Sequence, residues 1–106
     1  MPKYLIQGNY VGEGVKGLLK EGGSGRRAAI EKLAASMGGS VECFYYAFGK
    51  GDVYVIVDMP DNTSMAALAL AANASGAVSV TTTVLMTPEE VDVVAKKTPD
   101  YRPPGK

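Results

Sequence analysis

Two kinds of apolar repeat alternate along the sequence, and their order limits the fold more than any other feature. Apolar residues at every second position are typical of half-buried strands, and apolar residues three or four apart are typical of helices. The period of two appears in four segments, residues 3–10, 40–48, 52–59 and 77–86. Helical spacing fills the intervals after the first and third segments and returns over residues 87–97. The sequence therefore predicts the order β-α-β-β-α-β with an added C-terminal helix.

Turn and capping residues mark the ends of these elements. The glycine-bearing link at residues 49–51 is typical of a hairpin, so the strands on either side of it should pair antiparallel. The helix over residues 65–74 is preceded by three side chains that can cap it, those of Asp61, Thr63 and Ser64. The last helix has the strongest start signal, a capping box with proline in the first turn, formed by Thr87, Pro88 and Glu90.

The first helical interval is interrupted by the sequence "GGSGRR", residues 22–27. Its glycines predict the end of one helix. A second helix can begin with Ser24 as its cap. The apolar stripe of this second helix consists of Ile30, Leu33, Ala34 and Met37.

Two interpretations of this segment stay open. Free backbone N–H groups at the start of the second helix, together with Arg26 and Arg27, could hold an anion. In the alternative interpretation the segment is a joint between two helices, and both guanidinium groups pair with Glu21 and Glu31 or point into water.

A chain of 106 residues with this order of elements fits one α+β domain of the ferredoxin-like type. Such a domain has a four-stranded sheet with helices on one face. We expect this sandwich, with its interrupted first helix, over residues 1–97. Residues 98–106 contain three prolines and should form an extended tail. A core of this size is marginal, so association between copies would be a natural supplement.

The second strand is apolar on both sides, which indicates a second buried surface. Alternation divides its side chains into two sets, Val41, Cys43, Tyr45 and Ala47 on one side and Phe44, Tyr46 and Phe48 on the other. We expect the open faces of two sheets, one from each of two copies, to meet. Phe44, Tyr46 and Phe48, or their alternate-face neighbours, should lie at this contact. Alternatively, the C-terminal helix or tail of the same chain covers the face.

Composition excludes several classes of function. The net charge at pH 7 is zero, so there is no electrostatic reason to expect nucleic acid or an anionic membrane as a partner. With no histidine and one cysteine, Cys43, the chain lacks the usual ligand sets for zinc and any Ser-His or Cys-His nucleophile pair. We expect no metal and no bound cofactor. The first residues contain no apolar run of the length of a signal peptide or membrane span, so we expect a cytoplasmic protein.

Several polar residues could line a small-molecule site between the sheet and the helices. They are Gln7, Asn9, Lys16, Tyr45, Tyr46, Asp52 and Asn73. Tyr45 and Tyr46 are adjacent in a strand and point to opposite faces, where packing explains both more readily than catalysis does. Asn73 lies in an otherwise apolar helix and either contacts a ligand or ties the helix end to a neighbouring loop.

Four segments carry a family resemblance: "MPKYLIQGNY", "GVKGLLKEGGSGRRAAIEKLAASMGG", "FYYAFGKGDVYVIVDMPDN" and "TTTVLMTPEEV". Over about residues 2–93 they resemble the GYD-domain proteins, small bacterial proteins placed with the ferredoxin-like dimeric α/β barrels. The resemblance implies this fold and a tendency to oligomerise, with no settled activity. One departure lies in the hairpin, where the family often places a tyrosine before the aspartate that matches Asp52. This chain has Gly51 at that position.

Two classes of function fit the sequence. In the first, the protein is a non-catalytic oligomeric module that binds a small molecule or a partner protein. In the second, it is a cofactor-independent enzyme, similar to a monooxygenase or an isomerase, that works in a pocket between sheet and helices. The second hypothesis rests on the analogy between folds.

Overall fold

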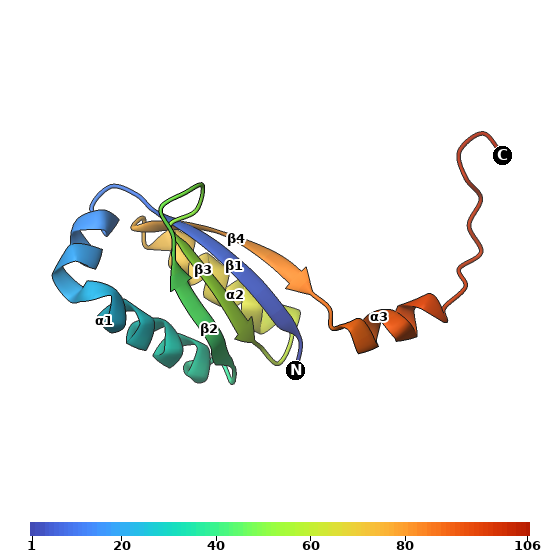
Figure 1. Cartoon of the computed structure of the whole chain (residues 1–106), viewed down its shortest axis with the longest axis horizontal. Helices are drawn as coiled ribbons and strands as arrows, with labels where there is room; N and C mark the ends of the chain where they lie inside the picture. The colour runs from blue at the N-terminus through green and yellow to red at the C-terminus, as the bar shows by residue number, and fades with distance from the viewer.

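The computed structural model describes residues 1–106, and its elements follow the predicted order (Figure 1). The elements are β1 (Lys3–Tyr10), α1 (Gly14–Ser36), β2 (Ser40–Tyr46), β3 (Val53–Asp58), α2 (Asn62–Ala74), β4 (Val78–Leu85) and α3 (Pro88–Ala95). The chain is therefore α+β, with the β-α-β-β-α-β order of a ferredoxin-like sandwich followed by an added helix.

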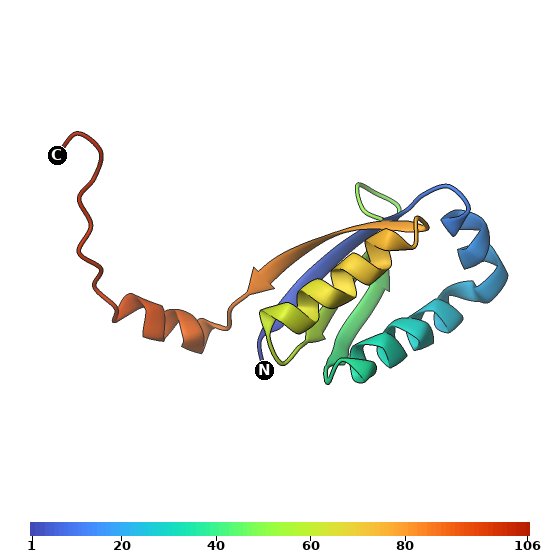
Figure 2. The same cartoon turned by 180° about the vertical axis from the view of Figure 1, so that it is seen from behind.

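The four strands form one antiparallel sheet in the order β2-β3-β1-β4. In the centre, Ile6 of β1 lies opposite Val55 of β3 and Thr82 of β4. Residues that lie opposite one another share a face, so the register divides the side chains between two faces. Figure 1 looks onto the face that no helix covers, which we call the open face, and Figure 2 shows α2 lying across the other face.

A β-bulge in β2 changes which side chains lie under the helices. Val41 is opposite Val57, yet Cys43 is opposite the next residue of β3, Ile56. The extra residue is Glu42, and it breaks the simple alternation of the strand. Val41 therefore lies on the helix-covered face while Cys43 lies on the open face. The prediction that these two share a side was wrong, because alternation along one strand does not reveal a bulge.

The core consists of nine buried apolar residues, and the strands supply most of it. They are Tyr4, Ile6, Ala34, Val53, Val55, Val57, Met59, Met65 and Leu68. Two of the nine come from α2 and only Ala34 comes from α1. The long first helix therefore contributes little to the core, and several apolar side chains beneath it stay half-buried.

The predicted interruption of the first helix is confirmed, although its detail differs. The backbone of α1 leaves helical geometry at Gly22, which has φ 79° and ψ 167°. This combination is essentially restricted to glycine, because a Cβ atom would clash with the backbone. The break precedes Ser24, which lies inside the helix and makes no capping hydrogen bond. Gly22 therefore sets the position of the bend.

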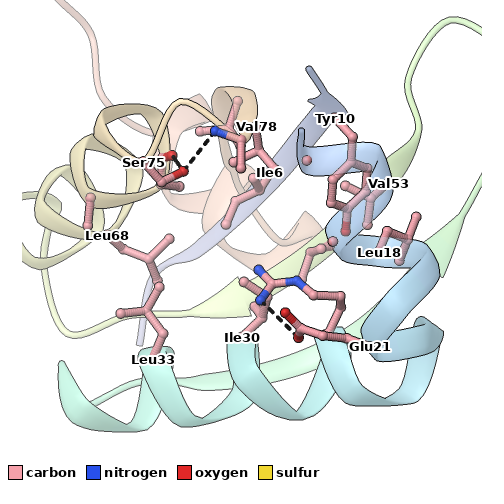
Figure 3. Close-up of a pocket in the computed structure, with 18 of the residues that line it drawn as sticks. Ile6, Tyr10, Leu18, Glu21, Ile30, Leu33, Val53, Leu68, Ser75 and Val78 are labelled. Carbon is pink, nitrogen blue, oxygen red and sulfur yellow. Dashed lines mark hydrogen bonds and ion pairs between the residues drawn. The ribbon is translucent and has the colours of Figure 1, made fainter. Parts of the chain in front are cut away.

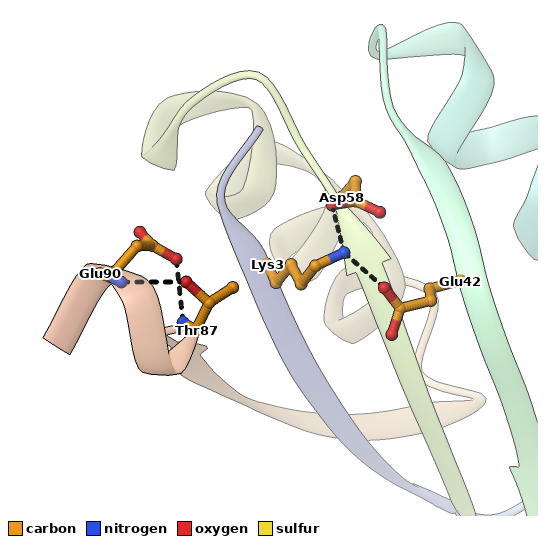
Figure 4. Close-up of polar contacts among 5 residues, drawn as sticks. All are labelled: Lys3, Glu42, Asp58, Thr87 and Glu90. Carbon is orange, nitrogen blue, oxygen red and sulfur yellow. Dashed lines mark hydrogen bonds and ion pairs between the residues drawn. The ribbon is translucent and has the colours of Figure 1, made fainter. Parts of the chain in front are cut away.

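The capping predictions for the other two helices are confirmed. Asp61 Oδ1 accepts a hydrogen bond from the backbone N–H of Ser64 at 2.8 Å, and this bond lowers the pKa of the Asp61 carboxyl. At the start of α3, Thr87 and Glu90 each accept from the other's backbone N–H, at 3.1 and 2.9 Å (Figure 4). Both helices therefore begin where their sequence signals place them.

The C-terminal helix and tail project away from the sheet (Figures 1 and 2). No residue of α3 is buried, and Val91, Val93 and Val94 are about half exposed. The molecule consequently extends 57 Å along its longest axis. The alternative that this helix or tail covers the open face is therefore wrong for this chain. None of the helices has both the length and the apolar character needed to cross a membrane.

Candidate functional site

A cavity of about 410 Å³ lies between the sheet and the two long helices, and we call it the sheet–helix cavity (Figure 3). All four strands contribute residues to its floor, and α1 and α2 form its walls. Fourteen of the twenty residues that line it are apolar. These are Ile6, Tyr10, Leu18, Ile30, Leu33, Phe44, Val53, Val55, Leu68, Ala71, Ala72, Ala77, Val78 and Val80. Such a lining suits an apolar molecule.

The first half of α1 is held against the start of β4. The helix begins at Gly14, which is buried, and a Cβ atom there would lie 1.9 Å from the carbonyl oxygen of Ala77. Only glycine permits this approach of two backbones. The backbone N–H of Val11 donates to the same Ala77 oxygen at 2.9 Å. These contacts close one end of the sheet–helix cavity.

The second half of α1 is held against β2. The hydroxyl of Tyr46 donates to the carbonyl oxygen of Gly23 at 3.0 Å, directly after the bend. Further along, Ala34 is fully buried. Because the two halves are held at separate places and meet at a bend, α1 does not lie flat on the sheet. Ile30 and Leu33 therefore line an open space.

The charged residues of the lining, Glu13, Glu21 and Arg26, all lie in or beside α1, whereas the polar Ser75 lies at the end of α2. Arg26 Nη1 lies 3.5 Å from Glu21 Oε2, and this ion pair spans the bend in the helix (Figure 3). The two side chains are 27% and 47% exposed, so the pair is partly removed from water. Figure 3 shows Glu21 near Ile30, while Leu33 and Leu68 lie toward the other end. The cavity thus has a polar end and an apolar end.

Tyr46 lies close to this polar end. Burial, together with the neighbouring Tyr10, raises the pKa of its hydroxyl to about 12, while Arg26 and Arg27 act in the opposite direction. The hydroxyl therefore keeps its proton at neutral pH and donates it to the carbonyl oxygen of Gly23.

Of the nine residues predicted to contact a ligand, only Arg26 lines the sheet–helix cavity. Gln7 and Asn9 lie on the opposite, open face of the sheet, because they are out of phase with the buried residues of β1, and Tyr45 lies there because it is opposite Tyr54 of β3. Lys16 points into water, where its Nζ lies 3.5 Å from Glu13 Oε2 and its side chain is 77% exposed. For these four residues the predicted placement in the cavity was wrong.

Two further predicted residues hold the backbone. Asp52 Oδ2 accepts from the backbone N–H of Tyr10 at 2.9 Å, which joins the hairpin to the end of β1. Asn73 Oδ1 accepts from the backbone N–H of Val80 at 2.8 Å, which joins the end of α2 to β4. Asn73 therefore ties a helix end to its neighbour, one of the two roles that the sequence left open.

The two arginines of the "GGSGRR" segment have different surroundings. Arg26 pairs with Glu21, as the joint interpretation expects. Arg27 lines a second hollow beside β2, together with Glu31 and Cys43. Anion binding by the pair stays a prediction.

The three residues predicted at a subunit interface lie in different places. Phe44 and Tyr46 are opposite Val55 and Val53, so both lie on the helix-covered face, where their rings meet edge to face at 5.2 Å. Phe48 lies beyond β2 and is fully exposed. The placement of Phe44 and Tyr46 on the open face is therefore corrected. Their alternate-face neighbours on that face are Cys43 and Tyr45.

A charged cluster lies at one end of the open face (Figure 4). Lys3 Nζ donates to Asp58 Oδ1 at 2.9 Å and also contacts Glu42 Oε1. Both bonds, the one to Glu42 first, raise the pKa of the Lys3 ammonium group. The cluster crosses three strands, β1, β3 and β2. It therefore links the bulged edge strand to the centre of the sheet.

Sequence reasoning missed most of the residues that line the sheet–helix cavity. It assigned Ile30 and Leu33 to the core, because both belong to the apolar stripe of the helix. Helical periodicity is the same whether that stripe faces packed side chains or a cavity. The available signal was the glycine pair at the bend, which lets a helix stand off the sheet. No group of three or more His, Cys, Asp or Glu residues is placed to hold a metal ion.

Comparison with known families gives a match over most of the chain. The model of the GYD domain family matches residues 4–95, which include all four strands except Lys3, the first residue of β1. No curated protein and no solved structure shows significant similarity to the chain. The match spans both walls and the floor of the sheet–helix cavity and ends at the last residue of α3. The chain belongs to the GYD domain family.

Proposed function

We propose that the protein is a non-catalytic module that binds a small apolar molecule in the sheet–helix cavity. One observation carries the proposal: a cavity of about 410 Å³ has fourteen apolar residues among the twenty that line it. This volume is typical of sites that enclose small organic ligands. Burying apolar surface there would contribute about 25 cal/mol per Å² removed from water.

The packing around the sheet–helix cavity supports binding. Ile30, Leu33 and Phe44 remain half-buried because nothing fills the space between them. A ligand would complete their burial and would stabilise the fold by binding the native state alone.

We also propose that two copies associate through the open face, as in a dimeric α/β barrel. The support is the apolar and aromatic character of this face, where Leu5, Tyr54 and Ile56 are only half-buried. Tyr45 on the same face is 69% exposed. A monomer rarely leaves such a surface to water, and two sheets pack face to face at about 10 Å. The association would also supplement a small core.

A fluorescent probe tests the binding proposal. N-phenylnaphthylamine is neutral and apolar, and its emission rises when it leaves water. We expect enhanced emission with the wild-type protein and a large loss of it with Ala72→Phe, which fills the sheet–helix cavity. Ala67→Phe is the matched control, because Ala67 lies on the same helix, is exposed and does not line the cavity. Equal emission from both variants, or none from the wild type, would contradict the proposal.

Sedimentation equilibrium tests the association. We expect a mass of twice 11.1 kDa for the wild-type chain at micromolar concentration. Tyr45→Lys places a charge on the open face and should return the protein to a monomer. Val93→Lys, on the exposed helix α3, is the control and should leave the dimer intact. A monomeric wild-type protein would remove the proposal.

A further inference from the structure

We infer that the ligand of the sheet–helix cavity is a neutral, mostly apolar molecule with one hydroxyl or amide group, placed between Glu21 and Arg26. The inference rests on the proposed function and adds the chemical class of the ligand. It follows from where the charged groups lie. The ion pair that lines the cavity, between Arg26 and Glu21, belongs to α1 (Figure 3).

Charge balance in the sheet–helix cavity favours an uncharged ligand. The guanidinium of Arg26 is already matched by the carboxylate of Glu21 at 3.5 Å. Glu13, the other acidic residue of the lining, lies 3.5 Å from Lys16. A ligand carboxylate would face Glu21 as well as Arg26, and a ligand ammonium would face Arg26 as well as Glu21. Burying either ion against an apolar wall without a free partner is unfavourable.

The geometry of the ion pair favours a group that both donates and accepts. At 3.5 Å the contact between Arg26 and Glu21 is longer than a strong charge-assisted hydrogen bond, which spans about 2.7–2.9 Å. The guanidinium has five N–H donors and the carboxylate can accept several bonds, so both keep unused capacity. A hydroxyl or amide can accept from Arg26 and donate to Glu21 at the same time.

The neighbouring tyrosine does not compete for this position. Tyr46 already donates its hydroxyl proton to the carbonyl oxygen of Gly23 at 3.0 Å. The wall near Ile6, Leu33 and Leu68 carries no charged residue, and the hydroxyl of Ser75 beside it is already bonded to the backbone of Ala72 and Ala77. The ligand is therefore oriented with its polar group toward the bend of α1 and its apolar body toward α2.

Four probes that share a naphthalene ring system test the inference: naphthalene, naphthol, naphthoate and naphthylmethylammonium. Each is titrated at pH 7 against the wild-type protein by displacement of N-phenylnaphthylamine. We expect naphthol to bind about tenfold more tightly than naphthalene, since its hydroxyl meets two charged partners. The two ionic probes should bind more weakly than naphthol. Tighter binding of naphthoate would overturn the inference and would indicate an anion site at Arg26.

A double variant and its control complete the test. Glu21→Met combined with Arg26→Met removes the ion pair, leaves unbranched apolar side chains in its place and should reduce naphthol to the affinity of naphthalene. Arg27→Met combined with Glu31→Met removes one basic and one acidic side chain outside the sheet–helix cavity and should keep the preference for naphthol. Equal affinity of naphthol and naphthalene in the wild type would refute the ligand class while leaving the proposed function intact. Failure of N-phenylnaphthylamine to bind would refute both.

Discussion

Substituting Gly22 by alanine should destabilise the protein although no neighbouring atom obstructs the new methyl group. A Cβ at Gly22 would have nothing within 4 Å, so the effect comes from the backbone alone. The glycine holds φ 79° and ψ 167°, a region that side-chain-bearing residues avoid. The helix cannot straighten freely, because Gly14 is fixed against Ala77 and Gly23 is bonded to Tyr46.

The expected magnitude follows from the backbone strain. Holding alanine in this conformation costs about 1 to 3 kcal/mol. For a chain of 106 residues, an unfolding entropy of about 2.1 cal/mol/K per residue gives a shift of about 4 to 5 °C for each kcal/mol. The unfolding midpoint of Gly22→Ala should therefore fall by about 5 to 14 °C.

Gly17→Ala is a matched control in the same helix. Its Cβ would also have nothing within 4 Å, but Gly17 has helical backbone angles. Alanine there should stabilise the protein by about 0.4 to 1 kcal/mol, because it restricts the unfolded chain and favours the helix. Both variants are measured by thermal unfolding followed by circular dichroism. A rise in midpoint for Gly22→Ala similar to that of Gly17→Ala would refute the assignment of the bend to this glycine.

Three other substitutions probe the core, the bend and the capping of α2. Val57→Ala truncates a fully buried side chain and should lower the free energy of unfolding, measured by urea titration, by about 2 to 3 kcal/mol. A loss below about 1 kcal/mol would show that neighbouring side chains fill the space left by Val57. Tyr46→Phe removes the hydrogen bond to Gly23 and should cost about 0.5 to 1.5 kcal/mol by the same assay; an unchanged midpoint would mean that water replaces the bond. Because the native fold lowers the pKa of Asp61, its contribution to stability is complete above the ordinary value of 3.8 and is lost as the pH falls through the lowered native value. Wild-type protein should therefore lose stability faster than Asp61→Asn on acidification below pH 3.8, and parallel acid-unfolding curves would contradict this account.

The elements of the fold were predictable because their signals are local. Thr87 and Glu90 lie three residues apart and specify the start of α3 without any tertiary contact. The bend in α1 was predictable from paired glycines, although the residue that makes it is Gly22 and Ser24 has no capping role. In each of these cases, backbone preferences of a few neighbouring residues decide the structure.

The site was less predictable because it depends on the spacing between elements. Alternation in β1 places Gln7 and Ile6 on opposite faces of the sheet. Gln7 was nevertheless chosen as a ligand contact because it is polar, and the structure places it on the open face. The bulge at Glu42 depends on how β2 pairs with β3, which one strand does not encode. The sheet–helix cavity depends on the angle at which α1 leaves its bend. The charged groups in it include Glu21 and Arg26, of which the sequence analysis had named only Arg26 as a ligand contact.

The bond between Asn73 and Val80 also bears on whether the sheet can grow. β4 is an outer strand of the sheet, and its eight residues contain no charge, proline or bulge. Such an edge is an inviting template for strand addition by another chain. The backbone N–H of Val80 is bonded by the side chain of Asn73 instead of a strand, so this outward donor is already occupied. A single carboxamide on α2 therefore occupies one of the outward backbone donors that an added strand would need.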